Sequence, residues 1–148
     1  MLYSSLLLKK MWVKYNANPI GKRTNDCVIR AICTVLNVSW DEVHDDLCDL
    51  SGELYTVPSD NENWAIYLDD LGFYREDLPH TCPEDCITVS QFAKSHKYGK
   101  FLLNTCEYEV ASNHNIIASG SHLIALINGC WYDTWNSGRE IIVSYWFR

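Results

Sequence analysis

Three residues of this 148-residue chain have the types and spacing needed for nucleophilic catalysis: Cys27, His122 and Asp133. Cys27 directly follows Asn-Asp, a dipeptide with N-cap chemistry, and the apolar positions of residues 27–36 recur at helical spacing. This pattern predicts a helix that begins at the cysteine. The start of a helix favours a thiolate, because its unsatisfied backbone N–H groups and its dipole attract negative charge. The sequence therefore predicts an activated thiol at Cys27.

The partners of this thiol are predicted by a β-hairpin over residues 122–135. Its loop is Asn128-Gly129, a strong signal for a two-residue turn because both central residues must adopt positive φ. The register set by this loop makes His122 and Asp133 diagonal neighbours on one face. Such neighbours lie about 7–8 Å apart at the backbone, a separation that an imidazole and a carboxylate can close with a hydrogen bond.

Each member of this Cys-His-Asp set has an expected role. Cys27 attacks a carbonyl carbon, His122 accepts and returns protons, and Asp133 holds the imidazole in one tautomer. The backbone N–H of Cys27 is expected to bind the developing oxyanion together with the side chain of Asn25 or Thr24, the nearest polar residues in the sequence.

Three further residues near this set have open roles. Asn136 is the alternative orienting residue for His122; it falls on the reverse face of the hairpin, and a one-residue slip in register would exchange the faces. Asp26 opposes thiolate formation unless, as an N-cap, it is engaged with backbone donors. Arg30 either offsets the charge of Asp26 or is a plain surface charge.

The other elements place helices first and strands later. Capping and C-terminal glycine signals predict helices at residues 27–36, 39–52, 59–71 and 88–99. Strand patterns occur at residues 11–15, 101–106 and 141–147 besides the hairpin, and residues 107–121 are ambiguous. This order predicts an α+β fold in which N-terminal helices pack on a C-terminal antiparallel sheet. Trp131, Trp135 and Trp146 are expected in the sheet core, and Trp135 could also shield the His–Asp bond from water.

Composition favours one globular domain over residues 1–148. The chain is 47% hydrophobic and 13% aromatic, enough for a core without disulfides at this length. No linker, repeat or charge block marks a domain boundary, and we expect residues 1–10 to be an extension that the fold does not need. The 12 Lys and Arg against 19 Asp and Glu give a net charge of −7. A nucleic-acid partner is therefore not expected, because phosphate-backbone binding draws on clustered cations.

No stretch approaches the roughly 18–20 apolar residues that span a bilayer, and Leu6-Leu7-Leu8 is too short for the apolar region of a signal peptide. We expect a cytoplasmic protein without a membrane partner. Its seven irregularly spaced cysteines are then expected to be buried thiols, one of them reactive, and not a disulfide framework.

A metal site and a cofactor are not expected. His80, Cys82 and Cys86 offer three zinc-ligand types within seven residues, with His96 as a distant fourth, but no second Cys/His pair of knuckle spacing follows. Phosphate-loop, dinucleotide-binding and zinc-protease motifs do not occur in the sequence.

Two strings around the candidate residues resemble a known superfamily. Residues 25–32 read Asn-Asp-Cys-Val-Ile-Arg-Ala-Ile, and residues 122–136 follow the pattern His-(x)6-Gly-(x)3-Asp-Thr-Trp-Asn. Both resemble small papain-like cysteine peptidase superfamily proteins of bacteria and phages, and the first string is also similar to the nucleophile motif of ovarian-tumour-type deubiquitinases. The resemblance spans about residues 12–148; it departs at Gly21, where papain carries Gln. It implies a papain-like fold and hydrolysis of a peptide or isopeptide bond in the cytoplasm of a bacterium or a phage-infected host.

Three functions are open at this point. The first is a cysteine hydrolase that cleaves an amide, peptide or isopeptide bond of a peptide or protein substrate through an acyl-enzyme. The second uses the same triad to transfer the acyl group to an amine, as transglutaminase-like and arylamine acyltransferase-like enzymes do. The third is a non-catalytic papain-like binding module, such as a phage or mobile-element protein that captures a host factor. The sequence predicts neither the identity of the substrate nor the oligomeric state.

Overall fold

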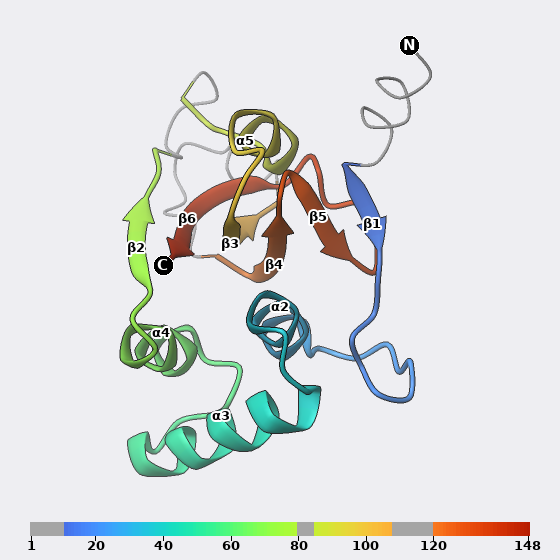
Figure 1. The fold of residues 1–148 in the computed structure, drawn as a ribbon. Helices are drawn as coiled ribbons and strands as arrows, with labels where there is room; N and C mark the ends of the chain where they lie inside the picture. Colours follow the sequence, from blue (N-terminus) through green and yellow to red (C-terminus); the bar gives the residue numbers. More distant parts are fainter. Residues whose placement is uncertain (1–10, 80–84, 108–119) are drawn as a thin grey trace.

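The computed structural model describes residues 11–79, 85–107 and 120–148, which form an α+β fold with four helices and a six-stranded mixed sheet (Figure 1). In chain order the elements are β1 (Trp12–Lys14), α2 (Cys27–Leu36), α3 (Trp40–Leu54), α4 (Asn61–Asp70), β2 (Tyr74–Asp77), α5 (Val89–Ser95), β3 (Lys100–Cys106), β4 (His122–Ile127), β5 (Cys130–Asp133) and β6 (Ile141–Phe147). Residues 1–10, most of 107–121, and His80 and Cys82 lie outside the described residues, so their predictions are not tested. No helix in the described part of the chain is long and apolar enough to cross a membrane.

The strand order is β1-β5-β4-β3-β6-β2, and every neighbouring pair is antiparallel except β1 and β5. The predicted antiparallel pairing is therefore confirmed for the C-terminal strands β3 to β6, but the sheet as a whole is mixed because the N-terminal strand β1 is parallel to β5. Parallel neighbours need a long crossover, and here nearly the whole chain lies between β1 and β5. Strand β2 was not predicted from the sequence, because all four of its residues are exposed and show no alternation between apolar and polar positions.

The two faces of the sheet are covered by different helices. Leu123 and Ala125 of β4 pack in one core cluster with α2, whereas Ile124 and Leu126 pack in a second cluster with α5. Figure 1 shows α2, α3 and α4 below the sheet and α5 above it. Consecutive side chains of a strand point to opposite faces, so β4 is apolar at four consecutive positions. The predicted packing of the cysteine-bearing helix on the sheet is confirmed.

Most predicted helix starts are confirmed, and two predicted ends are wrong. The Thr88 side chain forms a reciprocal capping box with Gln91, and Ser39 accepts a hydrogen bond from the Glu42 backbone N–H. However, α3 continues past Gly52 to Leu54, and Tyr55 takes the left-handed conformation with φ 56°. A glycine inside a helix is tolerated at a cost of about 1 kcal/mol. The last predicted helix also ends early, because α5 stops at Ser95.

The predicted hairpin register is confirmed. Asn128 and Gly129 have φ values of 50° and 78°, and the pairs on either side are Ile127 with Cys130 and Leu126 with Trp131. This register fixes which side chains of β4 and β5 share a face.

Candidate active site

The thiol candidate Cys27 is the first residue of α2, as predicted, but Asp26 does not cap this helix with its side chain. Its carboxylate accepts hydrogen bonds from Asn18 Nδ2 at 3.0 Å, Arg30 Nε at 2.7 Å and Trp40 Nε1 at 3.0 Å. The prediction that Asp26 is engaged with backbone donors was therefore wrong. Three side-chain donors hold the carboxylate instead, and they offset the negative charge beside the thiol.

The predicted hydrogen bond between His122 and Asp133 is confirmed. His122 Nε2 lies 2.6 Å from Asp133 Oδ2, and the Asp133 side chain is only 3% exposed. The same carboxylate accepts from the Ser137 hydroxyl at 2.6 Å and from the Thr134 backbone N–H at 2.8 Å. These donors fix the carboxylate, which in turn fixes the orientation of the imidazole.

Asn136 does not orient His122. Its Oδ1 accepts hydrogen bonds from Trp131 Nε1 at 3.3 Å and from the Gly138 backbone N–H at 3.1 Å, so it stabilises the loop after β5. The alternative orienting residue was therefore wrong, because the hairpin has the predicted register and not the slipped one.

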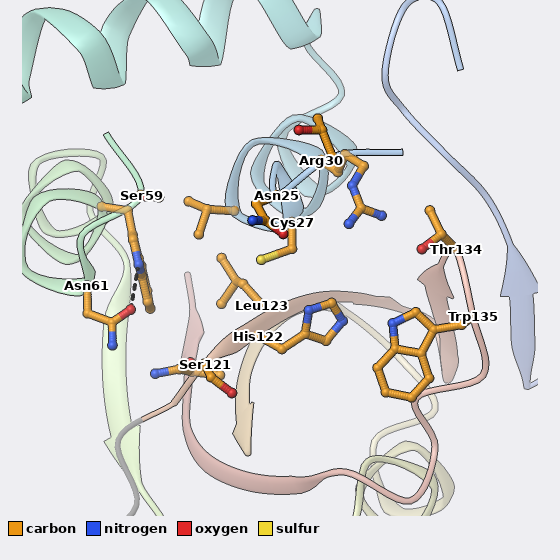
Figure 2. A pocket seen from close by; sticks show the side chains of 14 residues that line it. Asn25, Cys27, Arg30, Ser59, Asn61, Ser121, His122, Leu123, Thr134 and Trp135 are labelled. Atoms are coloured by element: carbon orange, nitrogen blue, oxygen red, sulfur yellow. Dashed lines mark hydrogen bonds between the residues drawn. The ribbon is translucent and has the colours of Figure 1, made fainter. Parts of the chain in front are cut away.

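The thiol of Cys27 and the imidazole of His122 lie close enough for each to shift the pKa of the other. Because His122 Nε2 is bonded to Asp133, Nδ1 is the ring nitrogen available to the sulfur. Figure 2 shows the sulfur of Cys27, at the start of α2, next to the imidazole of His122 from β4. The fold thus brings the three predicted residues together from α2, β4 and β5.

The pKa values of these groups favour a thiolate–imidazolium pair. Burial raises the pKa of Cys27, but its hydrogen bond with His122 and the charge of His122, helped by the Leu123 backbone and by Arg30, outweigh burial and bring this pKa below its ordinary value of 9.0. Burial lowers the pKa of His122, but Asp133 and Cys27 raise it to about 9. For Asp133, burial is likewise outweighed by the bond with His122, and the net pKa is lowered.

Replacing Cys27 with serine should lower the pKa of His122 from about 9, because the thiolate and its hydrogen bond both raise this pKa. NMR titration of the imidazole in the two proteins measures the change. The ring resonances of His44, on the exposed surface of α3, provide the reference. An unchanged titration of His122 would show that the sulfur and the ring do not interact.

Cys27 and His122 face a polar cleft of about 440 Å³, and Asn25 and Thr24, the predicted oxyanion candidates, both line it. Four further polar residues that line the cleft were not predicted from the sequence: Ser59, Asn61, Asn104 and Ser121. Asn104 belongs to β3 and pairs with Leu123, so it reaches the cleft through a strand pairing that the sequence did not predict. An amide inside the apolar run Phe-Leu-Leu-Asn-Thr-Cys was the signal that could have found it.

Arg30 connects the helix of the thiol to the strand of the carboxylate. Its side chain is 13% exposed, and it contacts Asp26 through Nε and Asp133 Oδ1 through Nη1 at 3.7 Å. It is therefore not a plain surface charge. This guanidinium holds two carboxylates at a fixed separation: that of Asp26, next to the thiol, and that of Asp133, which bonds the imidazole.

Trp135 lies beside the imidazole, with ring centroids 5.6 Å apart. It is 48% exposed, so the prediction that it fills the core was wrong, whereas Trp131 and Trp146 are buried as predicted. Its position is consistent with the predicted shielding of the His122–Asp133 bond.

The six cysteines of the described residues are free thiols. Within this part of the chain no three His, Cys, Asp or Glu side chains are arranged to hold a metal ion. Cys86 packs against a small core cluster that contains Cys106, and His96 stacks on Phe92 with ring centroids 3.7 Å apart.

Comparison with protein families, curated proteins and solved structures finds no match for this chain. The assignment of a chemistry to the cleft therefore depends on its residues and geometry.

Proposed function

We propose that this protein is a papain-like cysteine hydrolase that cleaves an amide, peptide or isopeptide bond through an acyl-enzyme on Cys27. The observation that carries the proposal is the imidazole of His122, which bonds Asp133 at 2.6 Å through Nε2 and lies close enough to the Cys27 thiol to lower its pKa. The packing of the cysteine-bearing helix against the strands that carry His and Asp supports the papain-like part of the proposal.

In the acylation step, the thiol proton moves to His122 Nδ1 and the sulfur of Cys27 attacks the carbonyl carbon of the scissile amide. The oxyanion is bound by the Cys27 backbone N–H, with Asn25 or Thr24 as its side-chain donor. The C–N bond then breaks, and His122 returns the proton to the leaving nitrogen, so that an amine departs and a thioester remains.

In the deacylation step, His122 takes a proton from a water molecule as the water oxygen attacks the thioester carbonyl. The C–S bond breaks, and the proton returns to the sulfur or is shared with it as an ion pair. The products are a carboxylic acid and free Cys27, and Asp133 stabilises the imidazolium that forms in both steps.

Selective alkylation of Cys27 tests the activated thiol on which this mechanism depends. At pH 7 an ordinary thiol is only a few per cent ionised, whereas a lowered pKa raises the thiolate fraction of Cys27. Iodoacetamide should therefore label Cys27 about tenfold faster than the other cysteines. Peptide mass spectrometry over a time course gives the rate at each cysteine.

The control within the same molecule is Cys48, whose sulfur lies 3.6 Å from His44 Nε2 on α3. If Cys27 and Cys48 react at similar rates, proximity to a histidine explains the labelling and the proposal loses its support. If Cys27 reacts selectively, its capture by electrophilic peptide probes or by ubiquitin-like probes separates peptide from isopeptide substrates.

A further inference from the structure

The cleft at Cys27 continues past Trp135 into a second hollow of about 280 Å³. Five residues line both spaces, which makes them parts of one groove: Thr24, Asn25, Arg30, Thr134 and Trp135. In Figure 2, Trp135 and Thr134 lie on one side of the sulfur, and Ser59 and Asn61 lie on the other. The groove therefore extends in both directions from the proposed nucleophile.

The end of the groove beyond Trp135 is cationic. Lys22, Arg23 and Arg30 line it together with Asp26. The Asp26 carboxylate is already bonded by Arg30, Asn18 and Trp40, whereas Lys22 and Arg23 are exposed. A hollow with excess positive charge in a chain of net charge −7 attracts an anionic group of a ligand.

At the opposite end of the groove, the described residues that line it carry no charge. Ser59, Asn61, Asn104 and Ser121 present hydroxyl and amide groups there. The two ends thus differ in charge, and a bound substrate has one preferred direction.

The position of His122 fixes this direction. His122 has to return a proton to the leaving nitrogen, so the leaving portion of the substrate lies on the imidazole side of Cys27. Trp135 stands beside the imidazole on that side, with ring centroids 5.6 Å apart, and it also lines the hollow with Lys22 and Arg23. A chain that continues from the leaving nitrogen therefore passes Trp135 and reaches the two cations.

We infer that the groove selects substrates whose leaving portion carries a carboxylate, which pairs with Lys22 and Arg23. The inference rests on the proposed function, because it assigns the leaving side from the proton transfer by His122. The carboxylate belongs either to an acidic side chain or to a free C-terminus. Acetylated, internally quenched peptides with a common acyl portion separate the two sources: one set carries Glu or Gln after the scissile bond, and the other ends in a free or an amidated C-terminus.

The test compares kcat/KM for these peptides in the wild type, in a Lys22→Glu/Arg23→Glu variant and in a Lys94→Glu/Lys97→Glu control. The control also reverses two positive charges, but these lie on α5 and directly after it, on the other face of the sheet. We expect the wild type and the control to prefer one carboxylate-bearing peptide over its amide by about tenfold, and the groove variant to lose this preference. Equal cleavage of acid and amide peptides by an active wild type would overturn the inference and leave the proposed function intact.

A wild type that cleaves none of the peptides counts against the proposed function, and a second measurement then decides the inference. The alkylation rate of Cys27 with anionic iodoacetate is divided by its rate with neutral iodoacetamide, which needs no substrate. The cationic hollow predicts that Lys22→Glu/Arg23→Glu lowers this ratio about fivefold relative to the control. An unchanged ratio would overturn the inference.

Discussion

Replacing Cys27 with alanine is expected to reduce turnover by about 10⁴-fold or more, because the sulfur forms and breaks the covalent bond in each step. The melting temperature should change little. Cys27 is only partly buried at the first position of α2, and alanine has the highest helix propensity. Steady-state hydrolysis of a substrate peptide, with the sequence of an electrophilic probe that reacts with Cys27, measures the turnover. A thermal melt measures the stability.

Cys48 offers a matched control for this substitution. Its sulfur lies 3.6 Å from His44 Nε2, and His44 Nδ1 lies 3.1 Å from Asp45 Oδ1, so the same three residue types meet on α3. These side chains are on the helix surface, and Asp45 is 76% exposed. Cys48→Ala should leave turnover unchanged. Turnover that survives Cys27→Ala and disappears in Cys48→Ala would show that the nucleophile is Cys48 and not Cys27.

The contrast between these two cysteines shows why residue types alone do not define a site. Asp133 is 3% exposed and accepts hydrogen bonds from three groups, so its charge acts on His122 without competition from water. An exposed carboxylate such as Asp45 is screened by solvent and salt. Burial of the carboxylate is therefore the feature that separates the proposed triad from the surface set.

The part of the site that could be predicted from the sequence depends on short-range geometry. A two-residue loop at Asn128-Gly129 fixes the register of β4 and β5, and this register alone brings His122 and Asp133 to the same face. The position of Cys27 at a helix start follows from the residues next to it. Neither prediction needed knowledge of the tertiary arrangement.

The part that could not be predicted depends on elements that meet only in the folded chain. The environment of Asp26 includes Asn18 and Trp40, which come from a loop and from another helix, so a local capping rule gave the wrong partner. The parallel pairing of β1 with β5 also joins distant parts of the chain.

Gly120 illustrates the same limit at the cleft. A Cβ atom built on this residue would overlap the side-chain amide of Asn104, so the backbone can approach β3 this closely only at a glycine. The Asn61 side chain donates a hydrogen bond to the Gly120 carbonyl at 2.9 Å. Helix α4, strand β3 and the segment before β4 thus meet at one wall of the cleft. The spacing of residues in the sequence does not predict these contacts.

Replacing Asp133 with asparagine is expected to reduce kcat/KM by about 10³–10⁴-fold, because an amide no longer stabilises the imidazolium or selects the productive tautomer. Asparagine also offers one acceptor oxygen where the carboxylate offers two to His122, Ser137 and the Thr134 N–H. We therefore expect the free energy of unfolding to fall by about 1–3 kcal/mol. Asp46→Asn is the matched control, since Asp46 is an exposed carboxylate that accepts from the Tyr67 hydroxyl at 2.9 Å.

The pH profile distinguishes loss of the His122 interaction from loss of structure. The leaving nitrogen needs the proton of the imidazolium, so kcat/KM declines as the pH rises through the pKa of His122, which is about 9 in the wild type. The negative charge of Asp133 raises this pKa, and asparagine removes that charge, so the decline in the variant should begin at a lower pH. A purely structural defect reduces kcat/KM by one factor at every pH where the variant is folded. An alkaline decline at the wild-type pH would therefore show that Asp133 does not control the proton of His122.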